Sequence, residues 1–412
     1  NSSPGYESGL LIDTCKYNMK YLMKRFIVVI LLMAPFVNSN CINRENCPNC
    51  IETADQVFLI NCRMPGFADR YHFRYKPYEF MNIFCSTYPI RYVFDLIDKD
   101  KLPSFRKIRI EFCQFSEEEP HEDVIKHLID ENVTELVFIY TSKLHKKNYA
   151  NFEQLTKLIS AYNNITDESV NLLHNLTNLE YLDLSHNSFT KLQTGFLDLA
   201  NLTAVDLSHN KLVTLEPGLF RRLQRLVSLR LEFNKLTNLS STIFQSLESL
   251  VSLNLAGNHL KQLPSSIFES LRALTFIDIS KNSFVDGGIP QDVFRNNNGL
   301  ETAFFTHNAE TLQSLPDRMF AELVKLRTVS LNNNGFTKLP ENLFTGSRSL
   351  ENITLSDNQM REIPENIFKD CRKIITLSLK GNMISHLPDM FKVISTLRKL
   401  DVSHNQLREF NT

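Results

Sequence analysis

The chain has 412 residues and a formal net charge of −1. A nearly neutral chain lacks the basic excess that the phosphate backbone attracts, so the charge argues against a nucleic-acid partner. Phenylalanine occurs 30 times whereas tryptophan is absent, which indicates that phenylalanine fills one structural position repeatedly.

The first segment of the chain does not begin with methionine. The first plausible start is Met19 or Met23, so we interpret residues 1–18 as upstream translation or foreign sequence and exclude them from the fold.

Residues 19–40 are predicted to be a secretory signal peptide. Positive residues are followed by an apolar run of 11 residues from Phe26 to Phe36, and Val37 and Ser39 have the spacing of a signal-peptidase site. The run is too short to span a bilayer, so a retained anchor is the less favoured alternative. No other stretch has the length and hydrophobicity to cross a membrane.

Residues 41–104 are predicted to form a cysteine-rich N-terminal cap. Six cysteines crowd into the cap and the start of the following region: Cys41, Cys47, Cys50, Cys62, Cys85 and Cys113. In an oxidising compartment, disulfides explain them better than a zinc or redox site does. Each bridge would stabilise a small cap by about 2–4 kcal/mol, and spacing alone does not choose the pairing. The isolated Cys371 is predicted to be a buried free thiol.

Residues 105–412 repeat one phrase about thirteen times, at spacings of 22 to 28 residues. The clearest copies run from Leu179 to Asn187 and from Leu202 to Asn210, and the phrase resembles the leucine-rich repeat. Its Leu-x-Leu core alternates with period two, which predicts a short strand with leucines inward. The asparagine that follows has an amide that can satisfy backbone groups of neighbouring coils. We therefore predict an α/β leucine-rich-repeat solenoid, a horseshoe with a concave parallel β-sheet.

A second set of residues repeats behind the first. Phenylalanines follow the asparagines by 9 to 12 residues and are predicted to stack in the core: Phe196, Phe220, Phe244, Phe268, Phe294, Phe320, Phe344, Phe368 and Phe391. Because stacked coils leave an open apolar end, the lack of a C-terminal cysteine cluster before Thr412 indicates a truncated solenoid.

Six Asn-x-Ser/Thr sequons favour a glycosylated extracellular surface. They are Asn132, Asn164, Asn175, Asn201, Asn238 and Asn352. In the repeat register Asn352 points outward from a concave strand, so a sugar there would cover distal strands.

The sequence offers little support for catalysis. Ser-His-Asn occurs three times, for example at 185–187, but adjacent strand residues point to opposite faces and do not form a nucleophile–base pair. We predict no catalytic, metal or cofactor site. A long repeated sheet instead indicates recognition of a folded protein.

Exposed apolar residues on the first repeats form the candidate ligand contact. They occupy outward positions on an otherwise polar sheet, which is typical of binding sites. These residues are Val137, Ile139, Tyr140, Ile159, Tyr162 and Tyr181. The alternative is a register shifted by one residue, suggested by Ser160 in an inward slot, which would bury them.

The cap resembles that of insect Toll receptors. The resemblance is carried by Cys47-Pro48-Asn49-Cys50, by the run from Phe58 to Cys62, and by the run from Tyr78 to Cys85. The segment from Leu312 to Phe320 resembles long repeats of that family. The resemblance implies the bridges Cys41–Cys50, Cys47–Cys62 and Cys85–Cys113.

The resemblance also implies a function for the parent protein. It implies a single-pass receptor on the plasma membrane that binds a cystine-knot cytokine of the Spätzle type on its extracellular side. It further implies possible receptor dimerisation, and signalling through a TIR domain that this chain lacks. A secreted decoy, a matrix protein and an adhesion protein without a signalling domain are the alternatives.

Overall fold

The computed structural model describes residues 49–52, 56, 58–63, 70–85, 102–114, 131–141, 152–167, 173, 175–308, 312–390 and 392–408. Two compact units, Asn1–Cys41 and Ile42–Thr412, make up the chain, and all described residues belong to the second. The predicted signal peptide and the segment before it lie outside the described residues. So do Cys41 and Cys47, and therefore two of the three expected bridges stay predictions.

The cap is a small antiparallel sheet. Its strands are β1 (Asn49–Glu52), β2 (Phe58–Arg63), β3 (Arg70–Lys76) and β4 (Phe80–Phe84). Each pairs antiparallel with the next, and β4 then pairs in parallel with β5 (Lys107–Glu111). The cap therefore continues the sheet of the solenoid, and its backbone occupies the hydrogen-bonding edge that the first repeat would otherwise expose.

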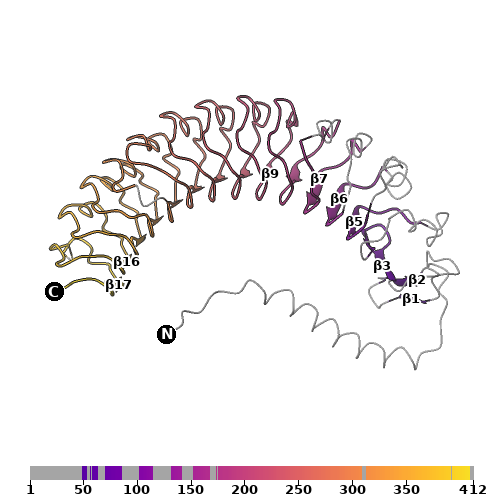
Figure 1. Cartoon of the computed structure of the whole chain (residues 1–412). Coiled ribbons are helices and arrows are strands. Elements are labelled where there is room, and N and C mark those ends of the chain that lie inside the picture. Colours follow the sequence, from indigo (N-terminus) through magenta and orange to yellow (C-terminus); the bar gives the residue numbers. More distant parts are fainter. Residues whose placement is uncertain are drawn as a thin grey trace, which may run out of the picture. The chain divides into compact units, whose positions relative to one another are not determined.

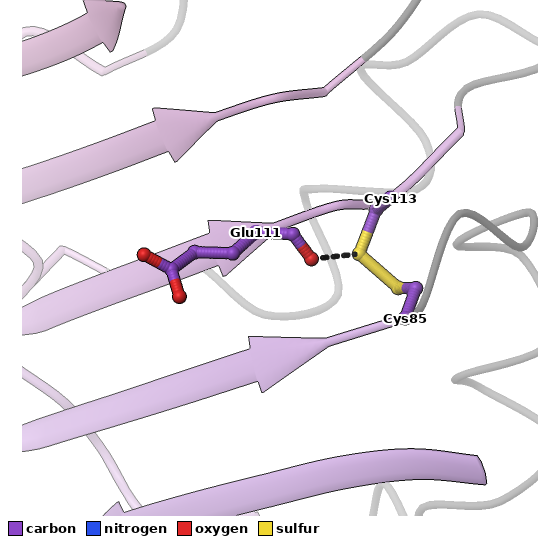
Figure 2. The surroundings of a disulfide bond; sticks show 3 residues. All are labelled: Cys85, Glu111 and Cys113. Atoms are coloured by element: carbon purple, nitrogen blue, oxygen red, sulfur yellow. Dashed lines mark hydrogen bonds between the residues drawn. A yellow bond between two sulfur atoms is a disulfide. The ribbon is translucent and has the colours of Figure 1, made fainter. Parts of the chain in front are cut away.

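A disulfide fastens this junction. Cys85 follows β4 and Cys113 follows β5, and their Cα atoms are 4.8 Å apart in the bridged pair. Figure 2 shows the bridge beside the Glu111 carbonyl oxygen, which lies 3.4 Å from Cys113 Sγ and also accepts the backbone N–H of Cys85. This is the bridge that the resemblance to Toll receptors implies for these two cysteines.

From β5 onward, every strand pairs in parallel with the next along the chain. The following strands are β6 (Glu135–Ile139), β7 (Lys157–Ala161), β8 (Tyr181–Asp183), β9 (Ala204–Asp206), β10 (Ser228–Arg230), β11 (Ser252–Asn254), β12 (Phe276–Asp278), β13 (Thr302–Phe304), β14 (Thr328–Ser330), β15 (Asn352–Thr354), β16 (Thr376–Ser378) and β17 (Lys399–Asp401).

Within this unit the coils follow one another along an arc, and the strands line its inner side (Figure 1). The central residue of the three-residue strands β8 to β16 is buried, as in Leu182, Leu229 and Ile353, while its two neighbours are mostly half-exposed. The predicted solenoid with a concave parallel sheet is confirmed. Turns rather than helices connect the strands in the described part, where no helix is long and apolar enough to cross a membrane.

The repeated asparagines form a continuous hydrogen-bonded ladder. Asn258 is typical: its Oδ1 accepts the Leu236 N–H of the preceding coil at 3.0 Å, and its Nδ2 donates to the carbonyl oxygens of Leu231 and Leu255, both at 3.0 Å. Each buried amide therefore satisfies backbone groups of two coils where no sheet hydrogen bond reaches them.

The phenylalanine spine is also present. Phe220, Phe244, Phe268, Phe294, Phe320, Phe344 and Phe368 are buried and stack in sequence, with ring centroids 5.5 to 6.4 Å apart. Phe196 instead contacts Phe189, and Phe391 lies outside the described residues. Cys371 is buried and free, as predicted, and burial raises the pKa of its thiol to about 12.

Candidate functional site: a ring ladder beside the concave sheet

The residue before the ninth position of the phrase, where most coils carry the ladder asparagine, leaves the strand in a left-handed conformation. Its φ is 51° at Tyr140, 60° at Tyr162, 54° at His186, 52° at His209 and 54° at Phe233. This region is uncommon for residues with a Cβ atom. Because it recurs from coil to coil, it places equivalent side chains in register just beyond the strand ends.

These side chains stack on one another. We call the series Phe112, Tyr140, Tyr162, His186, His209 and Phe233 the ring ladder. Successive ring centroids are separated by 4.9, 4.8, 3.9, 4.0 and 4.5 Å. These separations approach the spacing of about 4.8 Å between neighbouring strands, so one ring per coil suffices to build a continuous stack.

Glycine and lysine follow the last ring. At Gly257, with φ +66°, an added Cβ would lie 2.7 Å from the Phe233 ring, so a side chain there would displace it. The next residue in the same repeat position, Lys281, has its Nζ 5.4 Å from the centroid of the Phe233 ring. The ring ladder therefore ends in a cation–π contact.

Part of the ring ladder is open to solvent. Tyr140 is 49% exposed, Tyr162 is 40% exposed and Phe233 is 42% exposed. Exposed aromatic side chains that their neighbours hold in place lose little conformational freedom on binding, which is a property of interaction hot spots.

On the adjoining concave face, Ile159, Tyr181 and Asp183 are half-exposed. Ile159 lies opposite Asp183 in the sheet, and Lys157 Nζ lies 4.8 Å from the centroid of the Tyr181 ring. Burial, followed by the charge of Asp206, raises the pKa of Asp183 even though Ser185 donates hydrogen bonds to its carboxylate. The N-terminal concave face thus combines apolar groups with a carboxylate that has incomplete solvation.

Arg230 lies on β10, two strands beyond Asp183, and borders this surface. Its guanidinium lies 3.1 Å from Asp206 Oδ2 and also hydrogen-bonds Glu232 Oε1, while its side chain is 53% exposed. Glu232 is buried, and its Oε2 has no hydrogen-bond partner. Two carboxylates therefore hold an exposed arginine in one orientation.

The sequence-based contact set needs two corrections. Val137 is buried rather than exposed, and its cross-strand neighbours on that face, Arg109 and Ile159, have longer side chains, which accounts for its burial. Tyr140 and Tyr162 are exposed, but they lie beyond the ends of β6 and β7 because their left-handed backbone turns them out of the strand.

The shifted-register alternative does not hold. Ser160 is fully buried and its Oγ accepts a hydrogen bond from Asn163 Nδ2 at 3.0 Å, so a polar residue fits the inward slot. Ile139 and Ile159 are half-exposed, which is consistent with the outward register. Whether these residues contact a ligand stays a prediction.

The sequence analysis missed His186 and His209, because Ser-His-Asn was considered only as a possible catalytic pair, and it also missed Phe233. The signal was present: an aromatic or imidazole residue precedes the ninth position of the phrase in six successive repeats. It also missed Phe276 and Phe304, half-exposed on β12 and β13 of the concave face, with ring centroids 5.6 Å apart.

The sequon asparagines differ in accessibility. Asn132, Asn164, Asn175 and Asn238 are exposed, whereas Asn201 and Asn352 are half-exposed. Asn201 already donates from Nδ2 to the Thr177 carbonyl oxygen at 2.9 Å. Asn352 lies on β15, as the register predicted. Glycosylation itself stays a prediction at all six positions.

Comparison with known families identifies the repeats. Residues 153–212, 193–236 and 224–284 match a leucine-rich-repeat model, and residues 287–411 match six copies of a BspA type leucine-rich-repeat region. The chain is a leucine-rich-repeat protein. No curated protein sequence matches it.

Several solved structures share the fold of this leucine-rich-repeat protein. A structure of the Drosophila Toll–Spatzle complex matches with a TM-score of 0.71 and 23% identity, over 87% of this chain and 47% of the matched chain. The TLR13–ssRNA13 complex matches with a TM-score of 0.64 and 21% identity, over 80% of this chain and 50% of the other.

An internalin from Listeria monocytogenes matches with a TM-score of 0.59 and 20% identity, over 78% of this chain and 88% of its own. At these identities the likeness shows the fold alone. The leucine-rich-repeat protein spans about half of the matched Toll chain.

Proposed function

We propose that this chain is the ligand-binding part of a Toll-like receptor ectodomain, and that it binds a cystine-knot cytokine of the Spätzle type. The single observation that carries the proposal is the gathering of exposed apolar groups beside the cap. Tyr140 and Tyr162 of the ring ladder adjoin half-exposed Ile139, Ile159 and Tyr181. Most other concave positions, from Ser228 to Ser378, carry small polar residues.

The proposed ligand is a folded protein because of the surface that receives it. The strands from β5 to β17 form a long, shallow, curved sheet, which complements another protein rather than enclosing a metabolite. The likeness to the Toll–Spatzle complex supports a cystine-knot cytokine as the ligand. The resemblance of the cap to Toll receptors supports an extracellular position and, in a longer parent protein, a membrane span and a TIR domain.

The binding test compares tyrosine variants with a distal control. The secreted chain is titrated with a Spätzle-type cytokine in a biosensor or calorimeter, for the parent chain and for Tyr162→Ala and Tyr181→Ala. Each change should weaken binding by about 1–2 kcal/mol or more while secretion stays normal, because exposed anchors contribute to binding rather than to the core. His404→Ala, in the same repeat position as Tyr162 but near the far end, should leave affinity unchanged.

Two outcomes contradict the proposal. Normal secretion with unchanged affinity in both tyrosine variants would refute the assignment of this surface as the ligand-binding site. Failure of every Spätzle-type cytokine to bind would refute the proposed class of ligand. An adhesion or matrix role would then be the better supported function of the chain. Sequencing the transcript beyond the codon of Thr412 tests the receptor itself, since a secreted decoy predicts a stop codon without a membrane span.

A further inference from the structure

Two histidines lie face to face in the middle of the ring ladder. The rings of His186 and His209 are 4.0 Å apart at an interplanar angle of 9°. Tyr162 stacks on the outer face of His186 at 3.9 Å, and Phe233 stacks on the outer face of His209 at 4.5 Å. Both imidazoles are half-exposed, so protons reach them from solvent.

Charged groups lie on both coils of the histidine pair and on the coil that follows them. Asp183 lies on β8 and Asp206 on β9, and Arg230 and Glu232 lie on or just after β10. Beyond Phe233, Lys281 faces the stack from the next occupied position. Burial and then the neighbouring His209 lower the pKa of His186, while Asp206 acts in the opposite direction.

Stacking and protonation oppose each other at this pair. A single imidazolium is accommodated, because its charge is adjacent to the ring face of Tyr162 or Phe233. Protonation of both rings would place like charges face to face at 4.0 Å, where repulsion is strong and little water intervenes. The second proton therefore binds favourably only when the two rings move apart.

We propose that the His186–His209 pair is an acid-sensitive joint in the ring ladder, which opens between about pH 7 and pH 5 and weakens the hold on a protein ligand. The ligand part of this inference rests on the proposed function. Opening would displace Tyr162 and Phe233, since each is held on one face by an imidazole. The exposed aromatic surface would then lose the order that favours binding.

The chain provides matched controls for the pair. His307 and His404 occupy the same repeat position with the same backbone conformation, φ 55° in both. On the coils next to His307 the same position is occupied by Lys281 and Asn333, and on the coil before His404 it is occupied by Gly381. None of these three residues has an aromatic or imidazole ring. The chain also places Phe112 and Phe233 in the ring ladder, which shows that phenylalanine fits this backbone.

The first test needs no ligand. The full secreted chain, labelled at the histidine ring carbons, is titrated by NMR from about pH 8 to about pH 5, and signals are assigned with single His→Phe variants. We expect the ring signals of His186 and His209 to change in two steps, the second of which His307 and His404 do not show. We also expect the Tyr162 ring signals to shift with the second step. If the signals of all four histidines change alike and the Tyr162 ring signals do not shift, the proposal of an acid-sensitive joint is refuted.

The second test measures cytokine affinity at about pH 7.5 and about pH 5.5. We expect binding by the parent chain to weaken about tenfold at the lower pH, which corresponds to about 1.4 kcal/mol. The double variant His186→Phe/His209→Phe should lose this dependence, whereas His307→Phe/His404→Phe should keep it. Equal pH dependence in both double variants would refute regulation by the pair. If the cytokine binds at neither pH, the proposed function fails, and the NMR titration still decides whether the joint opens.

Discussion

Replacing one ladder asparagine tests how much the buried amides stabilise the solenoid. Asn258→Ala removes three hydrogen bonds of 3.0 Å, one to each of Leu236, Leu231 and Leu255. The two bonds donated by Nδ2 contribute about 1 kcal/mol each net, and the buried Leu236 N–H left without an acceptor costs about 1–3 kcal/mol. We therefore expect a loss of about 3–5 kcal/mol of unfolding free energy for this one substitution.

The matched control is Asn405→Ala, which removes equivalent contacts near the last described coil. Asn405 Oδ1 accepts the Ile384 N–H at 3.0 Å and Nδ2 donates to Leu379 at 2.9 Å, but this asparagine is half-exposed. Water can replace those contacts, so the expected cost is about 1 kcal/mol.

Urea denaturation followed by circular dichroism measures both free energies of unfolding. Because repeat arrays can unfold in parts, hydrogen exchange at the amides of Leu236 and Ile384 gives the local cost. We expect the Leu236 amide to lose most of its protection in Asn258→Ala. Equal destabilisation by the two substitutions would refute the reasoning that burial makes the ladder costly to break.

Three further predictions follow from burial and position. The Cys371 thiol, with a pKa of about 12, should resist an aromatic disulfide reagent in the folded chain and react fully in denaturant; rapid reaction under native conditions would contradict its burial. Phe268→Ala should lower the free energy of unfolding, measured by urea denaturation, by about 3–5 kcal/mol, because Phe268 is fully buried between Phe244 and Phe294. Phe233→Ala, at the exposed end of the ring ladder, should lower it much less. If glycopeptide mass spectrometry finds Asn352 occupied, Asn352→Gln should leave cytokine affinity within about 0.5 kcal/mol, and a large loss of binding would contradict a proximal binding surface.

The sequence by itself determined the repeated architecture. Leucines with period two and asparagines at nearly constant spacing specify strand and turn in each coil, because each choice is local and each coil repeats it. The phenylalanine spine and the buried thiol of Cys371 followed for the same reason. A side chain that recurs at one position of every coil must meet its counterpart on the next coil.

Only the tertiary structure decided which exposed side chains meet. Val137 had the sequence position of an exposed residue, but neighbours from two other coils decide its burial. Tyr162, His186 and His209 belong to different repeats, and their left-handed backbone turns all three out of the strand and into one stack. Hydrophobic periodicity fixes which residues face the core, since burial has a large free energy. It does not fix contacts along a solvent-exposed edge, which depend on backbone conformation and on the packing of neighbouring coils.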